Sequence, residues 1–81
     1  MSFAVRVVAV PPGRAHAYRE AEWRDALVLV ARGEIELEGV GGGRERFRRG
    51  AVLALDGLPL RALHNRGAAP ASLIAVSRRR L

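Results

Sequence analysis

The stretch between Asp25 and Leu55 constrains the fold more than any other part of this 81-residue chain. Directly after Gly33, two apolar residues, Ile35 and Leu37, alternate with three glutamates. An alternation with a period of two residues is typical of a β-strand with one buried face and one face in water. Glycines at positions 41–43 and 50 supply the backbone freedom that tight turns need. The stretch therefore predicts short strands joined by close turns.

Several other segments have the composition of strands. Apart from Arg6, both alternating sets of Phe3–Val10 are apolar, and the following Pro-Pro-Gly ends this run because proline cannot continue a ladder. Residues 14–22 are polar and could form a short strand at an edge. Further strands are predicted at residues 44–48, 51–55, 60–65 and 71–77. Many short strands with glycine and proline turns indicate a single all-β domain over residues 1–81, a sandwich or barrel.

Residues 20–32 fit two structures. Trp23, Ala26, Leu27 and Val30 have helical spacing, but the run of leucine and valine also suits a strand that ends at Gly33. We favour the strand, because a regular strand follows Gly33 at once and a hairpin would pair the two.

The charges of the next two strands also alternate. Three glutamates precede the glycine turn and three arginines follow it: Glu34, Glu36, Glu38, Arg44, Arg46 and Arg48. Opposite charges on facing strands give modest support to a hairpin. We therefore expect the glutamates and arginines to pair across this hairpin on its solvent face.

Composition narrows the class of protein. The chain has no cysteine, which excludes disulfides and thiolate chemistry. No apolar run is long enough for a membrane span or a signal peptide, so we expect a soluble cytoplasmic protein without a membrane partner. The net charge of +6 comes from arginine alone and could attract nucleic acid, but the four aromatic residues (two Phe, one Trp, one Tyr) offer few stacking platforms.

Three landmarks between Trp23 and Val76 resemble the motifs of small single-domain cupins, which are jelly-roll β-barrels. Residues 33–37 look like the glycine that ends the first cupin motif and the strand after it. Residues 50–55 look like the opening of the second motif, and Asn65-Arg66-Gly67 looks like its close. The resemblance covers about two thirds of the chain and implies an all-β, cupin-like jelly roll of short antiparallel strands.

The metal ligands of that family are missing from this sequence. The positions that correspond to its two histidines, its glutamate and its last histidine are Glu20, Glu22, Ala26 and Arg61, with Leu60 in place of Arg61 if the turn is shifted by one residue. A transition-metal site needs three or four imidazole or carboxylate ligands, and an arginine would repel the cation. We therefore expect no metal and no cofactor, and whether the protein is an enzyme stays open.

The leading hypothesis is a small-molecule-binding or regulatory module of cupin type. Its candidate pocket is the barrel mouth, lined by some of Trp23, Glu22, Arg61 and His64. Trp23 could instead be a core or interface anchor, and His64 a structural histidine; His16 is expected to be exposed. The alternatives are a metal-independent isomerase or lyase, using His64 and a carboxylate as acid and base, and a basic β-barrel that binds nucleic acid.

We also expect a homodimer, because several strands are apolar on both sides while a barrel strand needs only one inward face. The faces that would require cover are predicted on residues 3–10 and 27–31, with Val8, Val10, Val28 and Val30 among their outward residues.

Overall fold

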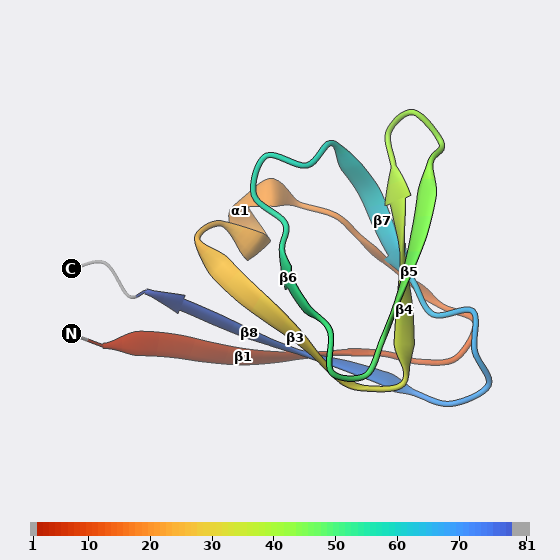
Figure 1. Ribbon diagram of the computed structural model, residues 1–81, viewed down its shortest axis with the longest axis horizontal. Coiled ribbons are helices and arrows are strands. Elements are labelled where there is room, and N and C mark those ends of the chain that lie inside the picture. The colour runs from red at the N-terminus through yellow and green to blue at the C-terminus, as the bar shows by residue number, and fades with distance from the viewer. Residues whose placement is uncertain (1, 79–81) are drawn as a thin grey trace.

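The computed structural model describes residues 2–78, and its regular secondary structure is almost all β-strand, as predicted (Figure 1). One helical turn interrupts the strands. In chain order the elements are β1 (Phe3–Val10), β2 (Ala15–Ala17), α1 (Glu20–Trp23), β3 (Ala26–Arg32), β4 (Glu34–Gly39), β5 (Arg44–Arg48), β6 (Val52–Ala54), β7 (Leu60–His64) and β8 (Ala71–Arg78). No helix within residues 2–78 has the length and apolarity needed to cross a membrane.

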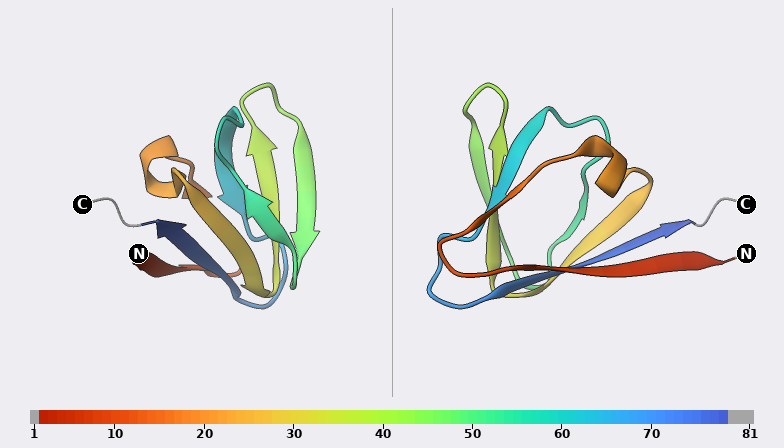
Figure 2. Two further views of the ribbon diagram at one scale, coloured as in Figure 1. Left: turned by 60° about the vertical axis from the view of Figure 1, so that its left-hand side comes forward. Right: turned by 180° about the vertical axis from the view of Figure 1, so that it is seen from behind.

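The strands form two antiparallel four-stranded sheets. Sheet A has the order β1-β8-β3-β6, and sheet B has the order β2-β7-β4-β5. Figure 2 shows the two sheets close together at one end of the molecule and splayed apart at the other, where α1 lies. Apart from the β4–β5 hairpin, neighbours in each sheet are not consecutive in sequence, so the chain crosses repeatedly from one sheet to the other.

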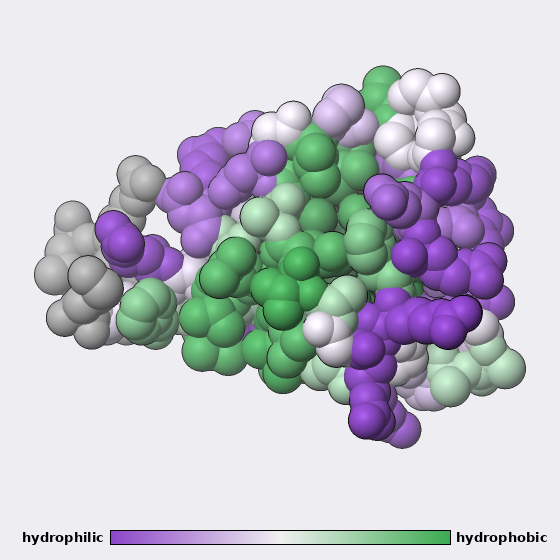
Figure 3. Space-filling model, viewed as in Figure 1, coloured by the Kyte–Doolittle hydropathy of each residue, from purple (hydrophilic) through white to green (hydrophobic). Residues whose placement is uncertain are grey.

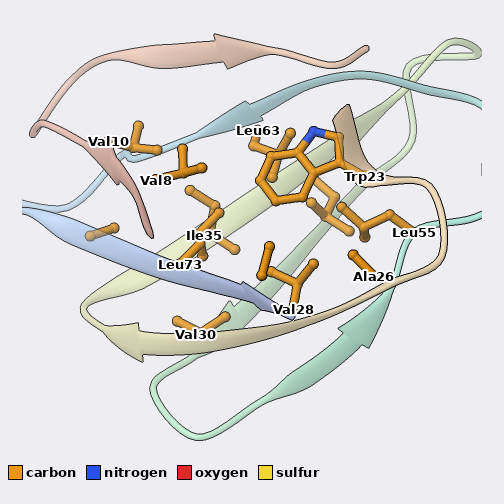
Figure 4. Packing of buried hydrophobic residues seen from close by; sticks show 13 residues of the cluster. Val8, Val10, Trp23, Ala26, Val28, Val30, Ile35, Leu55, Leu63 and Leu73 are labelled. Carbon is orange, nitrogen blue, oxygen red and sulfur yellow. The ribbon is translucent and has the colours of Figure 1, made fainter. Parts of the chain in front are cut away.

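The hydrophobic core fills the space between the sheets (Figure 4). Trp23 is fully buried near the α1 end, and Ile35 and Leu63 of sheet B lie opposite Val28 and Leu73 of sheet A. Burial of such large side chains contributes about 1.5–3 kcal/mol each. The interior of this small barrel is therefore occupied by its own side chains.

Gly33 is a corner between the sheets and not the turn of a hairpin. β3 pairs with β6 and β8 in sheet A, whereas β4 pairs with β5 and β7 in sheet B. The expectation that the strands on either side of Gly33 pair with each other is therefore wrong. Gly33 has a φ of 69°, and an added Cβ would lie 2.7 Å from the carbonyl oxygen of Pro70. The close approach of this loop leaves no room for a side chain.

The ambiguous segment 20–32 contains both structures in succession. α1 takes its first four residues, and strand β3 begins at Ala26. Alanine and two glutamates in a first turn favour a helix through propensity and the helix dipole. Asp25, with a φ of 58°, separates helix and strand. The preferred strand was right for residues 26–32 and wrong for residues 20–23.

The β4–β5 hairpin pairs the glutamates with the arginines, as predicted. Its cross-strand pairs are Glu34 with Arg48, Glu36 with Arg46, and Glu38 with Arg44. The expectation of a fully wet glutamate face is wrong at its centre, because Glu36 is buried. Arginine side chains cover it, including one from outside the hairpin, which a local sequence pattern cannot reveal.

The inward and outward faces of β1 and β3 are reversed relative to the prediction. Val8, Val10, Val28 and Val30 belong to the core, and their neighbours along the strands face outward. A strand with apolar residues on both sides contains no signal that tells one face from the other. Substitutions such as Val8→Asp or Val28→Asp would therefore test the core and not an interface.

Candidate functional site

The four residues predicted to line a pocket lie in two separate places. Glu22 and Trp23 belong to α1, whereas Arg61 and His64 belong to β7. In β7, Leu63 pairs with buried Leu37 on the inner face, and His64 pairs with Glu36 on the outer face of sheet B. The first pair is therefore at the open end of the barrel and the second is on its outside.

Glu22 forms a close pair with His16, which sequence reasoning had placed in solvent. The Nε2 atom of His16 lies 2.9 Å and 3.0 Å from the two carboxylate oxygens of Glu22 and donates to them. His16 sits on β2, opposite Leu63 of β7, and so faces the inner side of sheet B. The side chains of His16 and Glu22 remain 32% and 21% exposed, so small molecules can reach both.

Arg6 and Trp23 support this pair from sheet A and from the core. The Nη2 atom of Arg6 donates to the Glu22 carbonyl over 2.6 Å, and its Nη1 atom lies 3.6 Å from the Glu22 carboxylate. The Arg6 guanidinium also stacks over Trp23, 5.1 Å from the ring centre, a favourable cation–π distance. The His16 ring meets the Trp23 ring edge-on at 6.0 Å. Three elements thereby fix the position of the Glu22 carboxylate.

An open pocket of about 480 Å³ adjoins the His16–Glu22 pair, a volume in the range of small-molecule sites. Its lining also includes Arg19 and the alanines at positions 15, 17 and 21. The alanine methyl groups leave space beside the charged side chains. Such a pocket offers a carboxylate acceptor, an imidazole and a guanidinium donor to one small ligand.

Trp23 is a core anchor and not an exposed stacking platform. Its side chain is completely buried, and the side chains of His16 and Arg6 contact its ring. Its Nε1 is the sole buried side-chain nitrogen or oxygen within residues 2–78 that lacks a hydrogen-bond partner. An unpaired buried donor costs about 1–3 kcal/mol, which the packing of the large ring offsets.

His64 and Arg61 share a carboxylate, Glu38, on the outer face of sheet B. The Nε2 atom of His64 donates to Glu38 over 2.7 Å, and the Arg61 Nε lies 3.6 Å from the other oxygen. The hydrogen bond from His64 lowers the pKa of Glu38 below its ordinary value of 4.5. Arg61 turns outward where the β4–β7 register shifts between Glu38 and Gly39. This group is a histidine–carboxylate pair, but it lies outside the barrel.

Glu36 is the centre of an ion-pair network on the same outer face. Arg66 Nε and Arg44 Nη1 donate to one of its oxygens over 2.6 Å and 2.9 Å. These two hydrogen bonds, with that from Arg66 the stronger influence, lower the pKa of Glu36. Arg46 lies 3.9 Å from the second oxygen. The glutamates of β4 thus neutralise arginines from β5 and from the loop after β7.

Comparison with solved structures identifies the architecture. A protein from Neisseria meningitidis superposes with a TM-score of 0.68 at 14% sequence identity, over 95% of this chain and 74% of that one. A sugar phosphate isomerase of the cupin superfamily, from Silicibacter pomeroyi, superposes with a TM-score of 0.66 at 24% identity, over 98% of this chain.

The chain has a cupin fold. This confirms the architecture that the three sequence landmarks implied. The cupin-fold chain spans about half, 52%, of the Silicibacter pomeroyi protein, and at these identities the likeness concerns the fold alone. No protein-family model matches its sequence, and no curated protein sequence matches it either.

The residues at the usual cupin metal positions do not suit a metal. Glu20 and Glu22 lie two residues apart on a helical turn and so point in different directions; Glu20 pairs with Arg24 and Glu22 with His16. Ala26 has no ligand atom, and Arg61 is a cation on the outer face. Within residues 2–78, no three histidine, aspartate or glutamate side chains gather closely enough to hold an ion.

Proposed function

We propose that this cupin-fold protein is a small-molecule-binding module whose ligand is a small hydroxyl-bearing molecule held at the open end of the barrel. One observation carries the proposal: the His16–Glu22 pair is preorganised beside an open pocket. Preorganised polar groups next to free volume are the usual elements of a ligand site. Three of the four residues predicted to line the pocket therefore do not contact the ligand: Trp23 lies behind the pair, and Arg61 and His64 lie elsewhere.

The chemistry of the pocket favours a polar, hydroxylated ligand. A carboxylate accepts hydrogen bonds from hydroxyl groups, and Arg19, which also lines the pocket, supplies hydrogen-bond donors. Arg6 keeps the Glu22 carboxylate in place without filling the pocket, because it contacts Glu22 and Trp23 from sheet A. The binding groups thus need little reordering, which lowers the cost of binding.

A second candidate function is metal-independent acid–base catalysis by the same pair. An imidazole within 2.9 Å of a carboxylate can move a proton to and from a bound substrate. The structural neighbour from Silicibacter pomeroyi is a sugar phosphate isomerase, which makes hydroxylated substrates a sensible first choice. His64 and Glu38 form a second histidine–carboxylate pair on the outside of sheet B. Substitution of His64 is therefore the control for substitution of His16.

The fluorescence of Trp23 can report ligand binding, because Trp23 is the only tryptophan in the chain and its ring contacts His16 of the proposed site. We would titrate the protein with sugars, sugar phosphates and polyols while recording Trp23 fluorescence and the melting temperature. A ligand should change the fluorescence and raise the melting temperature. Glu22→Gln should weaken binding at least about tenfold, which corresponds to one lost charge-assisted hydrogen bond.

Glu20→Gln is the matched control, because Glu20 lies on the same helical turn, is largely exposed and pairs with Arg24. Equal affinity of Glu22→Gln and the native protein, or no response to any compound, would contradict the proposed site. Conversion of a bound compound, followed by NMR and lost in His16→Gln but kept in His64→Gln, would support the catalytic candidate.

A further inference from the structure

A second pocket lies away from the His16–Glu22 pair, at the end of the molecule where the two sheets come together. It is open and has a volume of about 540 Å³. Three segments line it: the corner at Gly33, the end of β5 with the turn after it, and the loop before β8 (Figure 1). These segments are far apart in the sequence, so only the tertiary structure brings their side chains together.

Two cationic side chains of this pocket have no acidic partner. Arg48 and Arg49 are exposed, and neither guanidinium forms an ion pair or a hydrogen bond within residues 2–78. Arg48 is opposite Glu34 in register, but the Glu34 carboxylate lies 3.9 Å from Arg46 instead. Figure 3 shows hydrophilic side chains over β5 and below it. The positive charge at this end of β5 is therefore available to an anion.

Hydrogen bonds fix the backbone of two segments that line the pocket. In the turn after β5, the Ala51 N–H donates to the Arg48 carbonyl over 3.0 Å, and the Gly50 N–H donates to a carbonyl of β3 over 2.8 Å. In the loop before β8, the buried Asn65 amide donates to the Ala69 carbonyl over 2.8 Å. Both segments are thus in place before a ligand binds, which lowers the cost of binding.

The loop before β8 adds hydrogen-bond donors from its backbone. Ala68 and Ala69 line the pocket, and their N–H groups donate to no group within residues 2–78. Their side chains are small, so a ligand can approach the backbone closely. The described lining contains one acidic side chain, Glu34, whose charge Arg46 offsets. The pocket therefore combines two free guanidinium groups with free backbone donors.

We propose that this pocket binds the phosphate group of a small phosphate monoester. Arginine forks bind phosphate in bidentate fashion, and the three terminal oxygens of a monoester can accept from Arg48, Arg49 and the backbone at once. A carboxylate has only two oxygens, which a single arginine fork can fill. Glu34 accepts a hydrogen bond from a hydroxyl group of the alcohol part. A nucleic acid would require a groove that follows its backbone over several nucleotides.

NMR spectroscopy of the ¹⁵N-labelled full chain tests this site, with glycerol phosphate as the ligand and acetate as the comparison anion at constant ionic strength. Glycerol phosphate should shift the amide signals of residues 67–69 and the Nε signals of Arg48 and Arg49, and acetate should shift them much less. Arg48→Gln and Arg49→Gln should each raise the dissociation constant at least about tenfold, the effect of one lost charge-assisted hydrogen bond.

Arg78→Gln is the matched control. Arg78 is also exposed and forms no ion pair within residues 2–78, but it lies at the far end of β8, opposite Phe3. Because exposed charges are screened over such a distance, this variant should bind like the native protein. Glu22→Gln should also keep the response, which separates this pocket from the proposed site at the open end.

Three results would overturn the proposal. The first is unchanged affinity in both pocket variants, and the second is an equal response to acetate and glycerol phosphate. The third is a short single-stranded DNA that shifts the signals of Arg48 and Arg49 while glycerol phosphate does not, which would assign these arginines to nucleic acid. Both pocket variants change exposed side chains, so their spectra should keep the signal dispersion of the folded protein.

Discussion

Asn65 shows how much a single side chain contributes to this fold. Its amide nitrogen donates to the carbonyl oxygens of Val10 and Ala69 over 2.9 Å and 2.8 Å, and its Oδ1 accepts from the Gly67 N–H over 2.9 Å. The side chain is almost completely buried. It thereby joins the end of β1 to the loop before β8, a role that the cupin-like landmark did not explain.

We predict that Asn65→Ala lowers the free energy of unfolding by about 2–4 kcal/mol, because one buried and two partly buried hydrogen bonds to backbone groups are lost. Asn65→Asp should be worse, since a carboxylate would face two carbonyl oxygens. Urea denaturation measures both changes. A loss below about 1 kcal/mol for both variants would show that other groups or water replace this side chain.

At the scale of elements, the corner at Gly33 decides which strands pair. A hairpin between β3 and β4 would have placed both in one sheet, but the corner sends them into different sheets. Gly33 and Gly13 have nearly the same positive φ, 69° and 73°. They differ in their surroundings, because a Cβ on Gly13 would meet nothing within 4 Å.

This difference gives a matched pair of substitutions. Gly13→Ala should cost about 1 kcal/mol for the left-handed backbone alone. Gly33→Ala should cost about 2–4 kcal/mol, because its Cβ would also collide with the backbone at Pro70 and Ala71. Thermal and urea unfolding of the two variants provide the measurement. Equal losses would mean that the loop before β8 shifts easily.

The outer face of sheet B should make stability depend on acidity. Hydrogen bonds from arginine and histidine lower the pKa values of Glu36 and Glu38 in the folded state. Their contribution to stability is therefore complete above the unfolded value, ordinarily 4.5, and is lost as the pH falls through the lower folded values.

We predict that the melting temperature falls as the pH is lowered from about 5 to 3, and that Glu36→Gln reduces this dependence. Glu45→Gln, in exposed Glu45 of the neighbouring strand β5, is the control and should keep the native pH profile. The explanation would be wrong if the profiles of Glu36→Gln and the native protein were parallel.

At the scale of the whole molecule, the two sheets share one core but have opposite outer surfaces. Trp23 and the aliphatic side chains of both sheets fill the interior. The outer face of sheet A is apolar, and that of sheet B is a network of ion pairs. Four of the fourteen arginines, Arg44, Arg46, Arg61 and Arg66, pair with the glutamates of β4, so these four have a structural role on sheet B.

A fold that is held by its core should not depend on a metal. We predict that dialysis against EDTA leaves the melting temperature and the circular dichroism spectrum unchanged, because Ala26 and Arg61 stand where ligands would be needed. Elemental analysis of the purified protein should find much less than one transition-metal ion per chain. A stoichiometric metal retained through dialysis would contradict this prediction and would point to Glu22 and His16.

The sequence by itself determined most of the strands and the pairing of the β4 glutamates with the β5 arginines, and the resemblance of three landmarks implied the cupin-like architecture. The strands and the hairpin depend on short-range alternation and turn residues, which act within a few positions of the chain. It did not reveal the partner of His16 or the outward phase of β1 and β3. His16 meets Glu22 because β2 pairs with β7 while α1 closes the end of the barrel. Val28 is buried and Leu27 exposed only because β4 and β7 cover one side of sheet A. Both features are consequences of long-range packing. For the faces of β1 and β3, a strand with apolar residues on both sides carries no local signal of which side is buried.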